Sequence, residues 1–184
     1  MFKNREEFPF TTTLEANWQI IRAELEAVNQ KDFLAWPEKH LYGKGWDVFG
    51  LYAFGLKLHK NSKLCHETTK LVETIPGLVT AGFSSLQPGT HIAAHTGYSD
   101  GVLRCHLGLI GCEGCTIRVG DDIRSWEEGK CFVFDDTTDH EVWHRGQQTR
   151  IVLLLDFKYP PPVEETKPKQ DEPKSNFWQK LFKS

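Results

Sequence analysis

Apolar residues recur at helical spacing near the start of the chain. They are separated by 4, 3, 4 and 3 residues: Leu14, Trp18, Ile21, Leu25 and Val28. This spacing predicts a helix over residues 11–30 whose apolar face packs on the outside of a sheet. Thr12 with Glu15 three residues later predicts a capping box, in which the two side chains satisfy free backbone donors at the start of the helix.

From about residue 47 the pattern changes to short apolar runs separated by Gly, Pro and Asp. Such runs predict strands over 48–58, 80–86, 102–109, 115–119, 130–134 and 150–157. We expect no long helix between them, which disfavours a parallel α/β sheet. The pattern therefore predicts a mainly β fold, a double-sheet jelly roll of the cupin kind with the N-terminal helix on its flank.

The composition changes after residue 159. Residues 160–162 are prolines, and residues 163–176 contain almost nothing apolar. Proline cannot donate ladder hydrogen bonds, and a polar stretch cannot bury enough surface to fold. We predict one domain over 1–158, a disordered Pro-rich and charged tether over 159–176, and a short amphipathic segment over 177–184. That segment suits weak docking on a membrane, a partner or the domain itself, or is a frayed end.

Composition and charge narrow the class of protein. A chain of 184 residues with 39% apolar content suits one compact core. A net charge of -3 provides no basic surface, so we expect no nucleic-acid partner. No apolar run is long enough to cross a membrane, and the first residues lack the apolar core of a secretory signal. We therefore expect a cytoplasmic protein without a transmembrane span.

Two of the five cysteines, Cys112 and Cys115, have the spacing of a metal or redox pair. A zinc ribbon needs a second such pair, which the sequence lacks. An odd number of cysteines in a chain without an export signal favours reduced thiols. We interpret the stretch as a turn between strands, with a zinc or redox role as the alternative.

Two histidines and an arginine carry the candidate chemistry. His95 and His140 are 45 residues apart, and Arg150 follows the second by ten residues. One histidine stands at a strand end near a Gly turn and the other on a distant strand, the layout of a metal pocket in a small β-barrel. Arg150 enters an apolar run that predicts a buried strand, where it needs an anionic partner such as a bound carboxylate. This arrangement indicates an iron-dependent oxygenase.

Alternation along the strand over 102–109 adds a second pair. Arg104 and His106 point to the same face of that strand, because successive side chains point to opposite sides. The pair is either an ordinary polar surface or part of the pocket.

Four motifs match a known family: PGTHIAAHTG at 88–97, LRCHLGL at 103–109, WEEGK at 126–130 and FDDTTDHEVW at 134–143. In these motifs the sequence resembles the aspartyl/asparaginyl β-hydroxylase family. The resemblance implies an Fe(II)- and 2-oxoglutarate-dependent dioxygenase with a double-stranded β-helix (jelly-roll, cupin-like) core. It covers roughly residues 11–158 and is most specific between 84 and 157.

Transferred residue by residue, the resemblance implies a role for seven side chains. His95 and His140 bind Fe(II), and no catalytic protein group is needed beyond these ligands. The resemblance also implies cofactor contacts: Arg104 and His106 at one end of 2-oxoglutarate, Ser84 and Arg150 at its other carboxylate, and Trp46 lining the same pocket. For Trp46, a core position under the barrel rim is the alternative. O2 is the second co-substrate.

The third iron ligand is missing from its usual place. Iron oxygenases commonly carry a carboxylate two residues after the first histidine, and Gly97 stands there. The resemblance implies that water takes this position, although a halogenase also leaves it open for a halide. Carboxylates near the histidines are candidate ligands or, by preference, supporting or turn residues: Asp100, Asp135, Asp136 and Asp139. We expect His91 and His144 at a polar rim of the entrance.

The resemblance favours hydroxylation at the β-carbon of an aspartyl or asparaginyl residue or of a related small molecule. Peptides, free amino acids and acyl chains all remain candidates. The alternatives are an iron/2-oxoglutarate halogenase, a cupin-type metalloenzyme that does not use 2-oxoglutarate, and a non-catalytic barrel that only binds.

Overall fold

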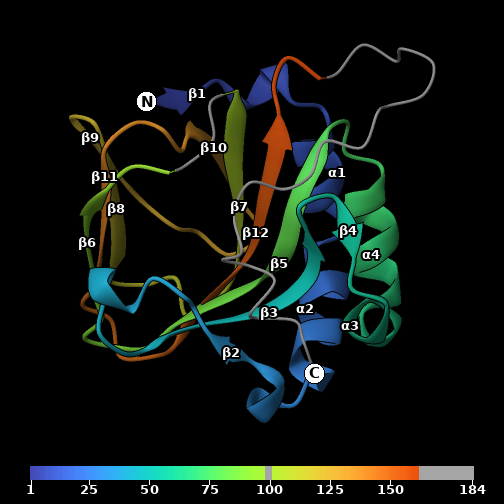
Figure 1. Ribbon diagram of the computed structural model, residues 1–184, viewed down its shortest axis with the longest axis horizontal. Helices are drawn as coiled ribbons and strands as arrows, with labels where there is room; N and C mark the ends of the chain where they lie inside the picture. The colour runs from blue at the N-terminus through green and yellow to red at the C-terminus, as the bar shows by residue number, and fades with distance from the viewer. Residues whose placement is uncertain (98–100, 162–184) are drawn as a thin grey trace.

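A computed structural model describes residues 1–97 and 101–161. Two antiparallel sheets face each other, and helices cover the outer side of the larger one (Figure 1). The major sheet has the order β1-β10-β7-β12-β5-β3-β2, with β4 paired to β3, and the minor sheet has the order β6-β11-β8-β9. This is the predicted mainly β, double-sheet jelly roll.

The strands of the major sheet are β1 (Phe2–Lys3), β2 (Leu34–Ala35), β3 (Trp46–Ala53), β4 (Leu56–Lys57), β5 (Leu78–Leu86), β7 (Val102–Ile110), β10 (Cys131–Asp135) and β12 (Arg150–Lys158). Those of the minor sheet are β6 (His91–His95), β8 (Cys115–Val119), β9 (Asp122–Ser125) and β11 (His140–His144). The helices are α1 (Phe10–Ala16), α2 (Trp18–Ala27), α3 (His59–Leu64) and α4 (His66–Glu73), with 3-10 turns at Arg5–Glu7, Gln30–Asp32 and Lys39–Leu41.

Strand β12 lies between β5 and β7 and divides the core into two layers. Ile151, Leu153 and Leu155 belong to the apolar cluster beneath the helices. Val152 and Leu154 belong to the cluster between the two sheets. Both faces of the strand are covered, which explains its unbroken apolar sequence, and alternation sends Arg150 into the space between the sheets.

The predicted N-terminal helix is present but is divided into α1 and α2 at Asn17. Leu14, Ile21 and Leu25 are buried against the outer face of the major sheet, as predicted. The predicted capping box is wrong, because α1 begins after Pro9 and has no side-chain cap. Glu15 instead accepts a hydrogen bond from the backbone of Cys131 at 2.9 Å, which ties the helix to β10.

Two predictions within the β region are wrong. The strand predicted over 48–58 is a hairpin, because Phe54 and Gly55 both have positive φ, 53° and 75°, and reverse the chain between β3 and β4. Helices α3 and α4 follow where no helix was expected. Their apolar face is short, and α4 buries Thr68 and Thr69, so the sequence carries a weak helical pattern there.

The minor sheet is the part that the strand prediction largely missed. Strand β8 has its predicted bounds, but the apolar runs did not predict β6, β9 or β11, although His95 was expected at a strand end and His140 on a distant strand. All four residues of β9 are exposed, and β11 buries Val142 between two histidines and alternates them with Glu141 and Trp143, so it shows no apolar run.

The stretch between Cys112 and Cys115 is a turn between β7 and β8, as predicted, and both thiols are buried and free. Gly114 has φ +71°, and a side chain there would lie 2.7 Å from the backbone of Gly146. The segments predicted as tether and amphipathic end lie almost entirely outside the described residues, as does Asp100. Within residues 1–97 and 101–161, no helix is both long and apolar enough to cross a membrane.

Candidate functional site

One pocket between the two sheets collects all seven predicted site residues: Trp46, Ser84, His95, Arg104, His106, His140 and Arg150. They come from β3, β5, β6, β7, β11 and β12, strands far apart in sequence. Apolar side chains complete the lining: Ile92, Ile117, Trp126, Phe134, Val142 and Leu154. Trp46 is thus both a pocket residue and a member of the core between the sheets.

His95 ends β6, His140 begins β11, and the two residues are direct partners in the strand register. Their ring centroids lie 4.2 Å apart. Each Nδ1 lies 2.8 Å from a carbonyl oxygen two residues earlier, of Ala93 and Thr138. A carbonyl only accepts, so each Nδ1 carries the hydrogen and each Nε2 keeps its lone pair for a metal.

The surroundings of His140 keep its imidazole ring neutral. Burial and the neighbouring His95 lower the pKa of His140 to about 3. A histidine must be unprotonated to bind a metal ion, so the environment of His140 favours the ligating form at neutral pH.

Arg150 is a buried cation, 2% exposed. Among the described residues no carboxylate forms an ion pair with it, and its Nε and Nη1 atoms have no hydrogen-bond partner. Its guanidinium carbon lies 4.8 Å from the Trp126 ring centroid. The guanidinium does hydrogen-bond to the buried Cys115 thiol, but burial raises the pKa of Cys115 and raises that of the nearby Cys112 to about 12, so neither thiol supplies a negative charge. A buried charge without a counter-ion is costly, so this end of the pocket suits an anion.

His106 presents a hydrogen-bond donor to the pocket. Its Nδ1 accepts a hydrogen bond from Trp126 Nε1 at 3.3 Å, which leaves the hydrogen on Nε2. That Nε2 is buried and has no partner among the described residues. Burial and the charges of Arg150 and Arg104 hold the pKa of His106 well below its usual value, so the ring is neutral.

Ser84 is oriented by a tryptophan. Trp46 Nε1 donates a hydrogen bond to Ser84 Oγ at 3.0 Å, so the hydroxyl hydrogen remains available for another acceptor. Trp46 is held in turn by stacking on Trp36, with ring centroids 4.5 Å apart and planes 9° from parallel.

Arg104 lines the pocket but already has two acidic partners. Its Nε and Nη2 donate to the two carboxylate oxygens of Asp156 at 2.7 and 3.0 Å. Its Nη1 lies 2.7 Å from Asp136 Oδ1. Although burial opposes the charge, Asp136 and Asp156 together raise the pKa of Arg104. Alternation along β12 puts Asp156 on the same face as Arg150, but the sequence did not indicate its pairing with Arg104, because that pairing depends on the register of β12 against β7.

Among the candidate carboxylates that the structure describes, Asp136 is the one beside the histidine pair. Its Oδ1 lies 3.5 Å from His140 Nε2. A Cβ on Gly97 would lie 1.9 Å from Asp136 Oδ2, so this carboxylate fills the space that a side chain two residues after His95 would need. Asp135 instead accepts from Thr137, and Asp139 from Arg118.

In the part of the chain that the structure describes, no group of three or more His, Cys, Asp or Glu side chains is arranged to hold a metal. His95 and His140 therefore stand as a pair, with Asp136 in a supporting position.

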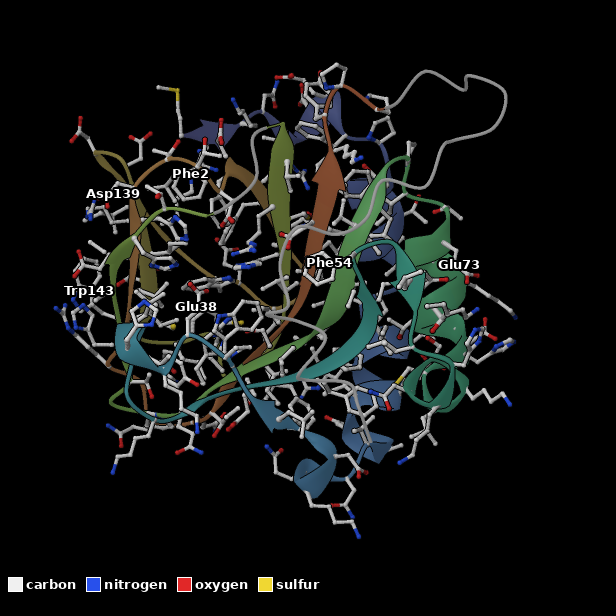
Figure 2. All side chains as sticks on the ribbon, viewed as in Figure 1. Phe2, Glu38, Phe54, Glu73, Asp139 and Trp143 are labelled. Atoms are coloured by element: carbon white, nitrogen blue, oxygen red, sulfur yellow. The ribbon has the colours of Figure 1, made fainter. Side chains whose placement is uncertain are left out.

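His91 and His144 do not line the pocket. His91 stacks on Trp143, which Figure 2 labels at the left edge of the molecule, on the minor sheet, and its Nε2 lies 2.7 Å from Glu141. His144 is buried and its Nε2 lies 2.7 Å from the Gln148 carbonyl oxygen. The predicted rim position is wrong for His144, which instead stabilises the turn between β11 and β12.

Comparisons with known proteins identify the fold and the family of the chain. A solved prolyl-4-hydroxylase from Pseudomonas putida shares the fold, with a TM-score of 0.51, 16% identity, and coverage of 77% of this chain and 86% of that one. An ornithine lipid ester-linked acyl 2-hydroxylase from Rhizobium tropici is 41% identical over 164 residues, covering 83% of this chain and 58% of the relative. The human aspartyl/asparaginyl beta-hydroxylase is 38% identical over 159 residues, covering 80% and 21%.

The chain thus spans 58% of the bacterial relative and 21% of the human one. The family model described as aspartyl/asparaginyl beta-hydroxylase matches residues 15–160, most of the described chain. The chain belongs to the aspartyl/asparaginyl β-hydroxylase family.

Proposed function

We propose that the protein is an Fe(II)- and 2-oxoglutarate-dependent dioxygenase that hydroxylates a C–H bond. The observation that carries this proposal is Arg150, a buried cation without a counter-ion in the pocket that contains the paired His95 and His140. A dicarboxylic co-substrate supplies the missing negative charge at one end and a metal-binding group at the other.

The chain's own residues would bind and orient the reactants. His95 and His140 hold the metal through Nε2, and Arg150 with the Ser84 hydroxyl binds the far carboxylate of 2-oxoglutarate. His106 Nε2 donates a hydrogen bond to the near end, and Arg104 retains N–H groups that its two aspartates leave free. With O2 and 2-oxoglutarate, the iron supplies the oxidation of the C–H bond. The apolar lining keeps water away from the reacting atoms.

The alternative functions differ in what they require of Arg150. A cupin-type enzyme that does not use 2-oxoglutarate has no need of a buried arginine without an acidic counter-ion in its metal pocket. A barrel that only binds would hold the ligand without converting it. A halogenase would share the entire co-substrate site and is distinguished by its product.

The first test measures Fe(II)-dependent formation of succinate from 2-oxoglutarate by the purified protein. Replacing His95 or His140 with Ala should lower turnover by at least about a hundredfold, because each removes half of the protein's metal ligands. His91→Ala is the matched control, because His91 is exposed and lies outside the pocket. Full turnover by either ligand variant, or no succinate from the wild-type protein with any candidate substrate, would refute the proposal.

For the substrate, we propose an acyl chain as a candidate beside an aspartyl or asparaginyl residue, because a small apolar hollow, hereafter the groove, lies next to the pocket. Residues of β3 and β5 form most of this groove, with Trp36 at its side, and none of its lining side chains is charged. Leu154 lines both the groove and the pocket, and Trp36 stacks on the pocket residue Trp46. A peptide backbone in such a groove would leave polar groups without partners, whereas an acyl chain would not.

The bacterial relative named for acyl 2-hydroxylation supports the same substrate class. Phe54, one of the groove residues, has an unusual backbone conformation. It lines the groove at the turn of the β3–β4 hairpin (labelled in Figure 2) and has φ +53°, a conformation that bulky side chains rarely adopt. Strain of this kind often marks a functional position.

Phe54→Asn tests the groove, because Asn suits the turn but removes the apolar ring. We expect the KM for long ester-linked acyl substrates to rise about tenfold, with a smaller effect on short chains. Leu56→Asn is the control, since Leu56 is exposed on the same hairpin and does not line the groove. An unchanged KM across the chain-length series, or preferred turnover of Asp and Asn peptides, would exclude the acyl substrate.

A further inference from the structure

Asp156 is a buried carboxylate that the proposed reaction does not use directly. It lies near the end of β12, 8% exposed, and does not line the pocket. In the strand register its direct partners are Arg104 on β7 and Thr80 on β5. Both of its oxygens accept hydrogen bonds from Arg104, at 2.7 and 3.0 Å. The two side chains therefore meet in a planar, bidentate arrangement that fixes the orientation of the guanidinium.

The fixed guanidinium reaches a second carboxylate on the metal side. Arg104 Nη1 lies 2.7 Å from Asp136 Oδ1, an ion pair in which that oxygen accepts no well-aligned hydrogen bond, and the same oxygen lies 3.5 Å from His140 Nε2. Asp156, Arg104 and Asp136 thus form a continuous row from the last strand to the histidine pair. We refer to these three residues as the ionic row.

The charge of the ionic row and the space around Asp136 both suit a metal ion beside the histidine pair. Arg104 alone would neutralise one carboxylate, but two carboxylates surround it, so the ionised row carries one net negative charge beside the histidine pair. That charge complements a divalent cation. The missing side chain of Gly97 leaves space for the Asp136 carboxylate, because a Cβ there would lie 1.9 Å from its Oδ2. Its remaining freedom is limited by Arg104.

We propose that Asp156 is a positioning residue for the metal centre: it fixes Arg104, and Arg104 holds the Asp136 carboxylate beside the histidine pair. Asp156 itself touches neither metal nor co-substrate. Without Asp156, the Arg104 guanidinium would be free to rotate, either toward Asp136 or into the pocket. The Asp136 carboxylate would then no longer be held at its position beside His140. This inference rests on the proposed function only in assuming a divalent metal at His95 and His140.

The test measures Co(II) binding to metal-free protein, by titration calorimetry and by the visible absorption of the bound ion. Asp156→Asn keeps the shape of the side chain and removes its charge. We expect Co(II) to bind at least about tenfold more weakly, with an altered absorption spectrum. Asp122→Asn is the matched control, because it removes one carboxylate from an exposed strand of the minor sheet. A Co(II) affinity and spectrum in Asp156→Asn equal to those of wild type would overturn the inference, as would an equal loss in Asp122→Asn.

A second variant keeps the test decisive if Asp156→Asn does not fold. Replacing Arg104 by Met and Asp156 by Leu together exchanges the buried pair for apolar side chains of similar size, which folds are known to accept. This double variant should fold and should weaken Co(II) binding as much as Asp136→Asn does. Wild-type binding by the folded double variant would overturn the inference.

Succinate formation is measured separately. A wild type that binds Co(II) but forms no succinate would refute the proposed function and leave the role of Asp156 standing.

Discussion

At the scale of single residues, Arg150 connects the energetics of folding to ligand binding. Its side chain is almost fully buried, and its Nε and Nη1 atoms have no partner among the described residues. Such an arrangement lowers the stability of the ligand-free protein, because the charge has lost water without gaining a counter-ion. It raises the affinity for a carboxylate for the same reason, since the cost of dehydrating the guanidinium is already met when the ligand arrives.

Arg150→Met separates these two effects. The free energy of unfolding of the ligand-free protein should rise by about 1 kcal/mol, because a buried unpaired charge is replaced by an apolar side chain. The KM for 2-oxoglutarate should rise at least about tenfold, since a charged hydrogen bond is worth about 1.5 kcal/mol or more. Urea denaturation and succinate formation provide the two measurements. A less stable variant with an unchanged KM would show that Arg150 has a structural role only.

At the scale of elements, the β3–β4 hairpin carries strain that a substitution can release. Phe54 and Gly55 both have positive φ, as in the two-residue turns where Asn-Gly is preferred. Phe54→Asn should therefore raise the free energy of unfolding by about 0.5 to 1 kcal/mol. Thermal unfolding of the variant beside Leu56→Asn measures the effect. A destabilised Phe54→Asn protein would indicate that the ring contributes more to packing than the turn loses in strain.

The elements also explain where strand prediction succeeded. β12 and β10 have unbroken apolar runs, and β5 and β7 are rich in apolar residues, because the major sheet is covered on both sides, by helices on one face and the minor sheet on the other. Strands β6 and β11 carry His95 and His140, the proposed metal ligands, and neither strand has a long apolar run, so the strand pattern did not reveal them. Site residues were easier to predict than the strands that hold them, because the motifs contain the histidines while the strand pattern does not.

At the scale of the whole molecule, several histidines are buried in neutral form, which makes stability depend on pH. Burial lowers the pKa of His106, His140 and His144. In the unfolded chain a histidine binds a proton near pH 6.5, whereas these folded-state rings do not. The unfolded state therefore takes up more protons as the pH falls below about 6.5, and the folded state loses stability in that range.

His106→Gln removes the contribution of one histidine to the pH dependence of stability while it keeps an N–H donor at that position. Between pH of about 7.5 and about 5.5, one such histidine costs the folded state about 1.4 kcal/mol. The metal-free variant should lose less stability than wild type over that interval by about this amount, with His140 and His144 still contributing. Urea denaturation at the two pH values, with a chelator present, measures the difference. Parallel losses in the two proteins would mean that the His106 pKa is not lowered in the folded state.

The sequence by itself determined the local features of this protein. The apolar run over 150–157 predicted a buried strand with Arg150 at its start, the spacing of apolar residues identified the first helix, and the family motifs pointed to His95 and His140 as candidate site residues. These predictions needed only periodicity or short motifs, which a single chain displays directly.

Only the tertiary structure decided which side chains complete the site. Asp156 meets Arg104 across 52 residues of sequence, and Asp136 occupies the space beside Gly97. These contacts depend on strand register and on the packing of one sheet against the other. Local pattern does not encode register, since a shift of one residue would send every side chain to the opposite face.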